Sequence, residues 1–153
     1  MKSNKGITLT SLLIYVIGLV IILTIVSTLT GYFTKNVNDI TVKNITEEQH
    51  TRFIAYVTKD VNSDNVSYIK TQSANKDYFI IYFEDGTEHQ YVLSNGIIYY
   101  IALENDTVTK KIAICNKVTS VSENVFTYEN NTLNYSFKID DKEFSGSFNI
   151  NLD

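Results

Sequence analysis

The N-terminal part of the chain is a long apolar run with very few polar interruptions. Residues 7–33 are mostly Ile, Leu and Val, diluted by Thr, Ser and Gly, and no charged residue falls between Lys5 and Lys35. About 20 apolar residues at a rise of ~1.5 Å cross a bilayer core of ~30 Å. The run therefore predicts a membrane-spanning helix, and the basic residues Lys2 and Lys5 before it favour a cytoplasmic N-terminus.

Residues 34–65 continue with the spacing of an amphipathic helix, in which apolar positions recur every three or four residues. The apolar positions are Val37, Ile40 or Thr41, Ile45, Phe53, Ile54, Val57 and Val61. No Pro or Gly occurs between Tyr32 and Asp85. One helix is therefore expected to run from the apolar segment into a soluble domain, with a possible break at residues 36–44, where Asn and Asp compete with helical hydrogen bonds.

From Val66 onward apolar residues recur at every second position, which predicts β-strands. Strands are expected over residues 66–71, 78–83, 87–93, 97–103, 107–115, 122–129 and 133–139, followed by an alternation of Phe144, Phe148, Ile150 and Leu152. Hairpin turns are expected at Asp85-Gly86, Asn95-Gly96, Asn105-Asp106, Asn130-Asn131 and Asp140-Asp141. Consecutive strands joined by short turns predict an antiparallel meander.

The alternation implies one buried and one solvated sheet face. The buried face needs a cover, and the amphipathic helix over residues 45–62 can supply it. The expected fold is α+β, with a long N-terminal helix, half membrane-spanning and half amphipathic, packed on an antiparallel meander in a lollipop layout. About six or seven strands are expected, in one sheet or two.

Charge and composition limit the classes of function. From Lys35 onward, 11 basic residues face 17 acidic ones, so this part carries about six negative charges. That excess argues against binding to a phosphate backbone as the main activity. Roughly 120 residues follow the apolar run, which is a normal size for one domain.

We find no catalytic constellation in the sequence, and we expect no enzyme activity, cofactor or metal. His50 and His89 are lone histidines expected at the surface, because no ligands stand at metal-binding spacing around them. Cys115 is the only cysteine and lies in an apolar stretch, so a buried, inert thiol is expected rather than a nucleophile.

Two groups of residues have more than one interpretation. Asp60, Asn62 and Asp64 have alternate spacing that could suggest calcium, but at a helix end we expect capping groups and solvated charge. The acidic Asp140-Asp141 pair is explained more simply as a hairpin turn than as a calcium-binding loop. Five tyrosines can form an adhesive patch or pack within the core and across strands: Tyr78, Tyr82, Tyr91, Tyr99 and Tyr100.

The segment Lys5-Gly6-Ile7-Thr8-Leu9 at the start of the apolar run resembles the leader junction of type IV prepilins and type II secretion pseudopilins. The resemblance implies cleavage between Gly6 and Ile7 on the cytoplasmic side by a prepilin peptidase, and N-methylation of Ile7. It divides the chain into a leader (1–6), a transmembrane or fibre-core helix (7–33), an amphipathic extension (34–65) and an antiparallel β domain (66–153).

Two positions depart from the family pattern. The fifth mature position is usually Glu and here is Ser11, and the chain has no Pro, which major pilins commonly carry in the helix. In the family that Glu is thought to pair with the terminal ammonium of a neighbouring subunit. A subunit without it suits the tip of a fibre better than the shaft, unless Ser11 only hydrogen-bonds its own helix.

The resemblance thus implies a minor pilin or pseudopilin that primes, caps or joins a type IV filament, which is a bacterial pilus, a type II secretion pseudopilus or a competence pseudopilus. The partners would be other pilins, the prepilin peptidase, the cytoplasmic membrane and the assembly platform. The alternatives are a secretory signal peptide, which the length of the run disfavours, an uncleaved single-pass anchor for an extracytoplasmic binding module, and an anchored enzyme.

Overall fold

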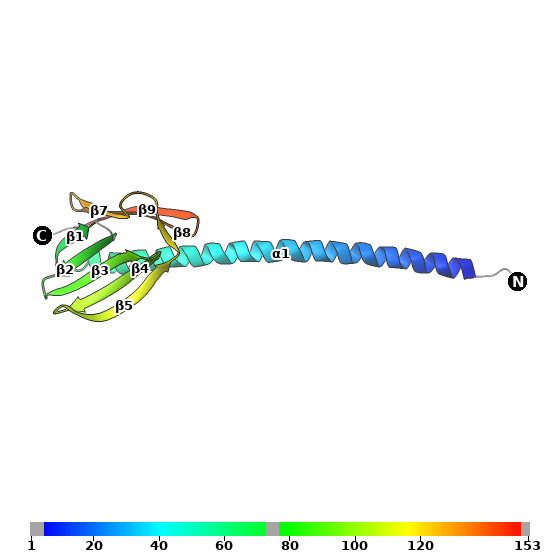
Figure 1. Ribbon diagram of the computed structural model, residues 1–153, viewed down its shortest axis with the longest axis horizontal. Coiled ribbons are helices and arrows are strands. Elements are labelled where there is room, and N and C mark those ends of the chain that lie inside the picture. The colour runs from blue at the N-terminus through cyan, green and yellow to red at the C-terminus, as the bar shows by residue number, and fades with distance from the viewer. Residues whose placement is uncertain (1–4, 73–76, 151–153) are drawn as a thin grey trace. The chain divides into compact units, whose positions relative to one another are not determined.

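The computed structural model describes the backbone of residues 5–72 and 77–150, so the leader residues 1–4 and Leu152 lie outside the described part (Figure 1). The chain divides into two units, residues 1–43 and residues 44–153. One helix, α1 (Lys5–Val61), accounts for the described part of the first unit and begins the second. The possible break at residues 36–44 does not occur within α1.

Several threonine hydroxyls of the first unit form hydrogen bonds within the helix itself. Threonine side chains donate hydrogen bonds to the backbone carbonyl four residues earlier, as in Thr24 to Val20 at 2.8 Å and Thr34 to Thr30 at 2.9 Å. Thr28, Thr30 and Thr41 make the same bond. The helix can therefore enter an apolar environment without leaving these hydroxyl donors unpaired.

The second unit contains two antiparallel sheets after the end of α1. The first sheet follows chain order as a meander of β1 (Val66–Gln72), β2 (Tyr78–Phe83), β3 (Thr87–Ser94), β4 (Ile97–Glu104) and β5 (Thr107–Asn116). The meander confirms the expected α+β class and the order of these five strands.

The second sheet centres on β8 (Thr132–Ile139), with β9 (Lys142–Asn149) on one side. On the other side β8 pairs with both β6 (Val118–Ser120) and β7 (Phe126–Glu129). The single strand expected over residues 122–129 is therefore wrong in its bounds. A bend at residues 121–123 separates β6 from β7, and the described residues form nine strands where six or seven were expected.

The hairpin turns are where the sequence predicted them. Both residues of Asn95-Gly96 have positive φ, 51° and 73°, and Asn105-Asp106 and Asn130-Asn131 do as well. Asn, Asp and Gly tolerate this conformation, which matches the twist of paired strands in a type I′ turn. Asp140 has φ 52° between β8 and β9, so the Asp140-Asp141 pair is a hairpin turn, as expected.

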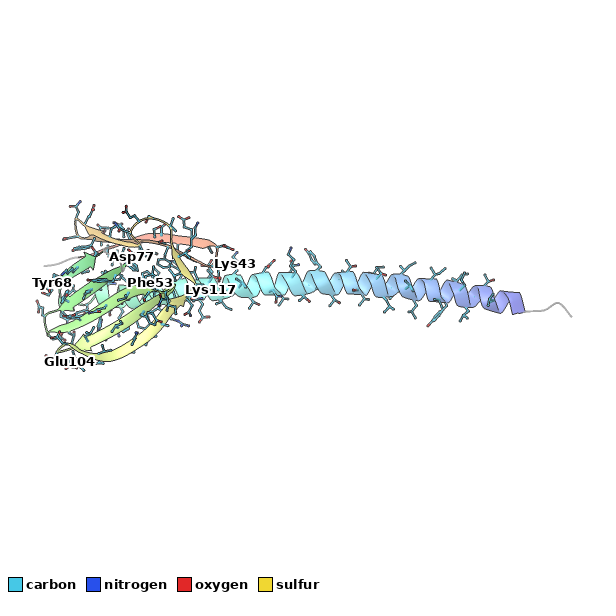
Figure 2. The ribbon with its side chains drawn as sticks, in the orientation of Figure 1. Lys43, Phe53, Tyr68, Asp77, Glu104 and Lys117 are labelled. Atoms are coloured by element: carbon cyan, nitrogen blue, oxygen red, sulfur yellow. The ribbon has the colours of Figure 1, made fainter. Side chains whose placement is uncertain are left out.

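The core of the second unit lies between the end of α1, from Phe53 to Val61, and the two sheets. Phe53 of α1 is fully buried (Figure 2), and its ring contacts Tyr91 of the first sheet and Tyr135 and Phe137 of the second. Val57 and Val61 extend the same buried face. The predicted apolar face was wrong at its start, since Ile45 is 49% exposed and Thr46 is buried.

Candidate functional site

The described side chains of the first unit form an exposed apolar surface on all sides of α1. Leu9 is 71% exposed, Val20 54% and Leu29 51%. α1 is long and apolar enough to cross a membrane. Such a surface is unfavourable in water, at about 25 cal/mol for each Å² of apolar area, so lipid or other apolar helices must cover it.

The residues expected at the processing junction lie at the start of this helix. α1 begins at Lys5, which places the Gly6–Ile7 peptide bond in its first turn. Backbone N–H groups in a first turn have no partner within the helix, so only this turn has to unwind before a protease can bind an extended chain. Ser11 lies one turn further along and is exposed.

A polar cluster lies between α1 and the inner face of the first sheet. Asp60 is only 5% exposed, and its Oδ2 accepts a hydrogen bond from the Tyr91 hydroxyl at 2.6 Å. The Nδ1 of His89 lies 2.8 Å from the same oxygen, but without the alignment of a hydrogen bond. The expectation of solvated charge at Asp60 was wrong, because strand β3 brings two polar partners to it.

Burial and the Asp60 carboxylate together alter the tyrosines of this cluster. Burial, followed by the nearby charge of Asp60, raises the pKa of Tyr91, and the same two causes raise the pKa of Tyr100. Both hydroxyls therefore stay protonated, and Tyr91 acts as a donor to the carboxylate. His89 packs its ring edge-on against Tyr100 and Phe83, so it is not the solvated surface histidine expected from the sequence.

A pocket of about 280 Å³ opens beside this cluster. Lys59, Ser63, Asp85 and Thr87 line it together with Asp60 and His89. Asp85 caps its own turn by accepting from the Thr87 backbone and hydroxyl, which lowers the pKa of Asp85. Across the described ranges, no three His, Cys, Asp or Glu side chains converge as metal ligands.

A second histidine contact docks α1 on the second sheet. The ring of His50 stacks on Phe144, with centroids 4.2 Å apart, and its Nε2 lies 3.0 Å from the Tyr135 hydroxyl. The Tyr135 ring lies over Gly146 opposite it on β9, where an added Cβ would come within 2.9 Å of ring atoms. The expectation that His50 lies on a solvated helix face was therefore wrong. Desolvation by burial lowers its pKa, partly opposed by Glu47 and reinforced by Lys142.

Further contacts hold the same turn of α1. Lys142 of β9 forms an ion pair with Glu47, and the Gln49 side chain accepts a hydrogen bond from the backbone N–H of Asn116. Cys115 is fully buried, as expected, and its thiol lies 3.4 Å from the Gln49 carbonyl. Burial raises the pKa of Cys115 to about 12, so the unreactive thiol form prevails.

The five tyrosines divide between the two faces of the first sheet. Tyr91 and Tyr100 belong to the core, at 0% and 6% exposure. Tyr78, Tyr82 and Tyr99 lie at the alternate positions of their strands and face the opposite side of the first sheet. Tyr68 joins them and stacks on Tyr82, a partner that the sequence analysis did not single out.

Comparison with models of known families, with curated proteins and with solved structures gave no match.

Proposed function

We propose that this protein is a minor pilin or pseudopilin, a structural subunit that primes, caps or joins a type IV filament after cleavage between Gly6 and Ile7. The observation that carries the proposal is the exposed apolar surface of α1, directly preceded by the Lys5-Gly6-Ile7-Thr8-Leu9 junction. Before assembly the chain is held in the cytoplasmic membrane by this helix, with its N-terminus inside and the β domain outside.

The physical basis of assembly is the replacement of lipid by protein around α1. Lipid tails are as apolar as Leu, so helices associate in the membrane through close packing rather than through the hydrophobic effect. A helix that leaves the bilayer has to keep its apolar surface covered. A bundle with the helices of other pilins provides that cover, and an assembly motor would extrude the bundle.

The β domain supports this role by being self-sufficient. Among the described residues, the hydrophobic core of the second unit lies within residues 53–150, which include the end of α1. Its folding therefore does not require the apolar part of α1, which stays available for other helices. Ser11 in place of the family Glu supports a position at the tip, because a subunit at the tip has no subunit ahead of it to pair with.

The second candidate function is an uncleaved, single-pass anchor for an extracytoplasmic binding module. The aromatic residues on the outer side of the first sheet favour a binding role for the domain. The two functions differ at the Gly6–Ile7 bond, which only the pilin needs to be cut.

Replacement of Gly6 tests the proposal. A Gly6→Phe chain should stay at full length in the membrane and be absent from purified filaments, because a bulky side chain before the cut prevents an extended backbone from entering the peptidase. Gly18→Ala is the matched control, since nothing lies within 4 Å of an added Cβ there, and it should be processed normally. Normal filament incorporation of Gly6→Phe would remove the basis of the proposal.

A further inference from the structure

The first sheet has an inner face that packs on Phe53 and a second face, which we call the outer sheet face. The middle row of the outer sheet face crosses all five strands in unbroken register. The row is Lys70, Ile80, Gln90, Ile101 and Lys111. Strands lie ~4.8 Å apart, so the two lysines stand roughly 19 Å from each other at opposite ends of the row.

Tyrosine rings flank this row on both sides. Tyr68 and Tyr82 are directly paired across β1 and β2, and their rings stack 4.1 Å apart at an interplanar angle of 13°. Tyr78 and Tyr99 lie on the other side of the row, and the Lys111 Nζ lies 4.7 Å above the Tyr99 ring. Ile80 is only 8% exposed although it faces outward, because Tyr78 and Tyr82 stand beside it.

Sheet stability alone explains part of this pattern. Lysines on edge strands such as β1 and β5 prevent pairing with other chains. Tyrosines stabilise sheets through cross-strand contacts. These roles do not require the open ring surface of Tyr68, which is 49% exposed while its other face rests on Tyr82. Open aromatic surface next to cationic groups is typical of a binding surface.

The size of the outer sheet face limits the kind of partner. Five strands and three residue rows cover roughly 19 Å by 14 Å, or about 270 Å². A stable interface between folded proteins takes ~800 Å² from each partner. These three rows alone therefore suit a linear chain that lies across the strands better than a folded protein.

The chemistry of the outer sheet face favours a sugar chain over a peptide. Peptides that bind sheets use backbone hydrogen bonds along an edge strand, whereas the open tyrosine rings lie on the flat of the sheet, where only side chains point outward. Flat tyrosine rings with polar tips suit the mixed C–H and hydroxyl surface of sugar rings. Lys70 and Lys111 favour acidic groups on the partner at the two ends of the row, whereas Glu88, which pairs with Tyr82, favours an uncharged part of the sugar chain there.

We propose that the outer sheet face binds a linear anionic polysaccharide. Sugar rings lie on Tyr68 and Tyr82, and carboxylate or phosphate groups pair with Lys70 and Lys111. This binding is independent of the proposed filament role, because it uses only the β domain and leaves the Gly6–Ile7 bond untouched. An uncleaved Gly6→Phe chain should bind the polysaccharide as well as the unaltered chain does.

The test measures binding to the full chain in lipid nanodiscs by isothermal titration calorimetry. The probes are a hyaluronan decasaccharide, a neutral dextran decasaccharide and a decaglutamate peptide. The variants are Tyr68→Ala, Lys111→Gln and Lys111→Arg, with Lys110→Gln as the matched control. Lys110 is the neighbouring residue on β5 and pairs with Ala102 on the inner row, so its side chain belongs to the opposite face. Near-UV circular dichroism checks that each variant is folded.

We expect hyaluronan to bind about tenfold more tightly than dextran or decaglutamate, and more weakly as salt is added. Tyr68→Ala and Lys111→Gln should each weaken binding about threefold to tenfold. Lys110→Gln should change it by less than about twofold, and Lys111→Arg should retain it because it keeps the charge. No hyaluronan binding, equal losses at Lys110 and Lys111, or equally tight binding of decaglutamate would each overturn the proposal.

Discussion

Asp60 illustrates how a single residue in this fold depends on partners far away in the sequence. A carboxylate that is 95% buried requires polar partners. Tyr91 and His89 supply them from β3, about 30 residues further along the chain. In the sequence, Asp60 has polar neighbours at the end of a helix, and this pattern indicates a carboxylate exposed to solvent. Only the register of β3 against α1 reveals the contact, and the same reason explains why the Tyr135 partner of His50 was missed.

Loss of the Tyr91 hydroxyl should destabilise the domain. Tyr91→Phe leaves the Asp60 carboxylate buried without its 2.6 Å donor, so the free energy of unfolding should fall by about 1.5–3 kcal/mol. Urea denaturation followed by near-UV circular dichroism measures this. Tyr128→Phe is the control, because its hydroxyl makes only an exposed 3.4 Å contact with Asn131, and it should cost less than about 0.5 kcal/mol. Equal losses in the two variants would contradict the buried contact.

His50 should make the domain less stable in mild acid. Its pKa is lowered by burial in the folded state, so the unfolded chain takes up the proton at a higher pH than the folded chain does. The stability that neutral His50 provides is present above pH 6.5, and it is lost as the pH falls from there through the lowered pKa. Unfolding at pH 7.5 and pH 5.5 should show a smaller drop for His50→Gln than for the unaltered chain. Identical drops would mean that His50 has no part in the pH dependence.

At the scale of elements, the sequence predicted the structure best where local chemistry decides it. Asn-Gly and Asn-Asp pairs adopt positive φ through their local conformational preference, so the turns and the five-stranded meander could be predicted. The bend between β6 and β7 has no Gly or Pro, and the Ser136 N–H of β8 donates a hydrogen bond to the Val125 carbonyl just before β7. The spacing of apolar residues in α1 also predicted a helix with one apolar side. It did not predict which residue would face the domain, and there Thr46 is buried while Ile45 is exposed.

The identity of residue 11 should control how many copies of this chain enter a filament. Ser11→Glu supplies the carboxylate that a neighbour's terminal ammonium can pair with, so a tip subunit should become able to enter the shaft. An unpaired carboxylate in an apolar bundle is unfavourable, which makes the pairing specific. Quantitative mass spectrometry of purified filaments should show several-fold more of this chain relative to the major subunit. Ser11→Ala is the control and should leave the ratio unchanged; an unchanged ratio for Ser11→Glu would argue against the tip position.

At the scale of the whole molecule, the two units differ in whether they bury their own apolar side chains. Residues 44–153 contain a core of their own, whereas none of the described side chains of residues 9–43 is buried. The apolar run of the sequence predicted the exposed helix, whereas the boundary between residues 43 and 44 falls inside the predicted amphipathic extension, residues 34–65. The pattern does not specify what covers the apolar helix, because lipid and neighbouring helices are equally apolar.

The most direct test of the central claim is the N-terminal sequence and intact mass of the protein from its native membrane, with and without prepilin peptidase. With the peptidase, we expect a chain that begins at Ile7 and carries a methyl group on its amine. Without the peptidase, we expect a chain that begins at Met1. A chain beginning at Met1 in both cases would contradict the claim and identify α1 as an ordinary membrane anchor.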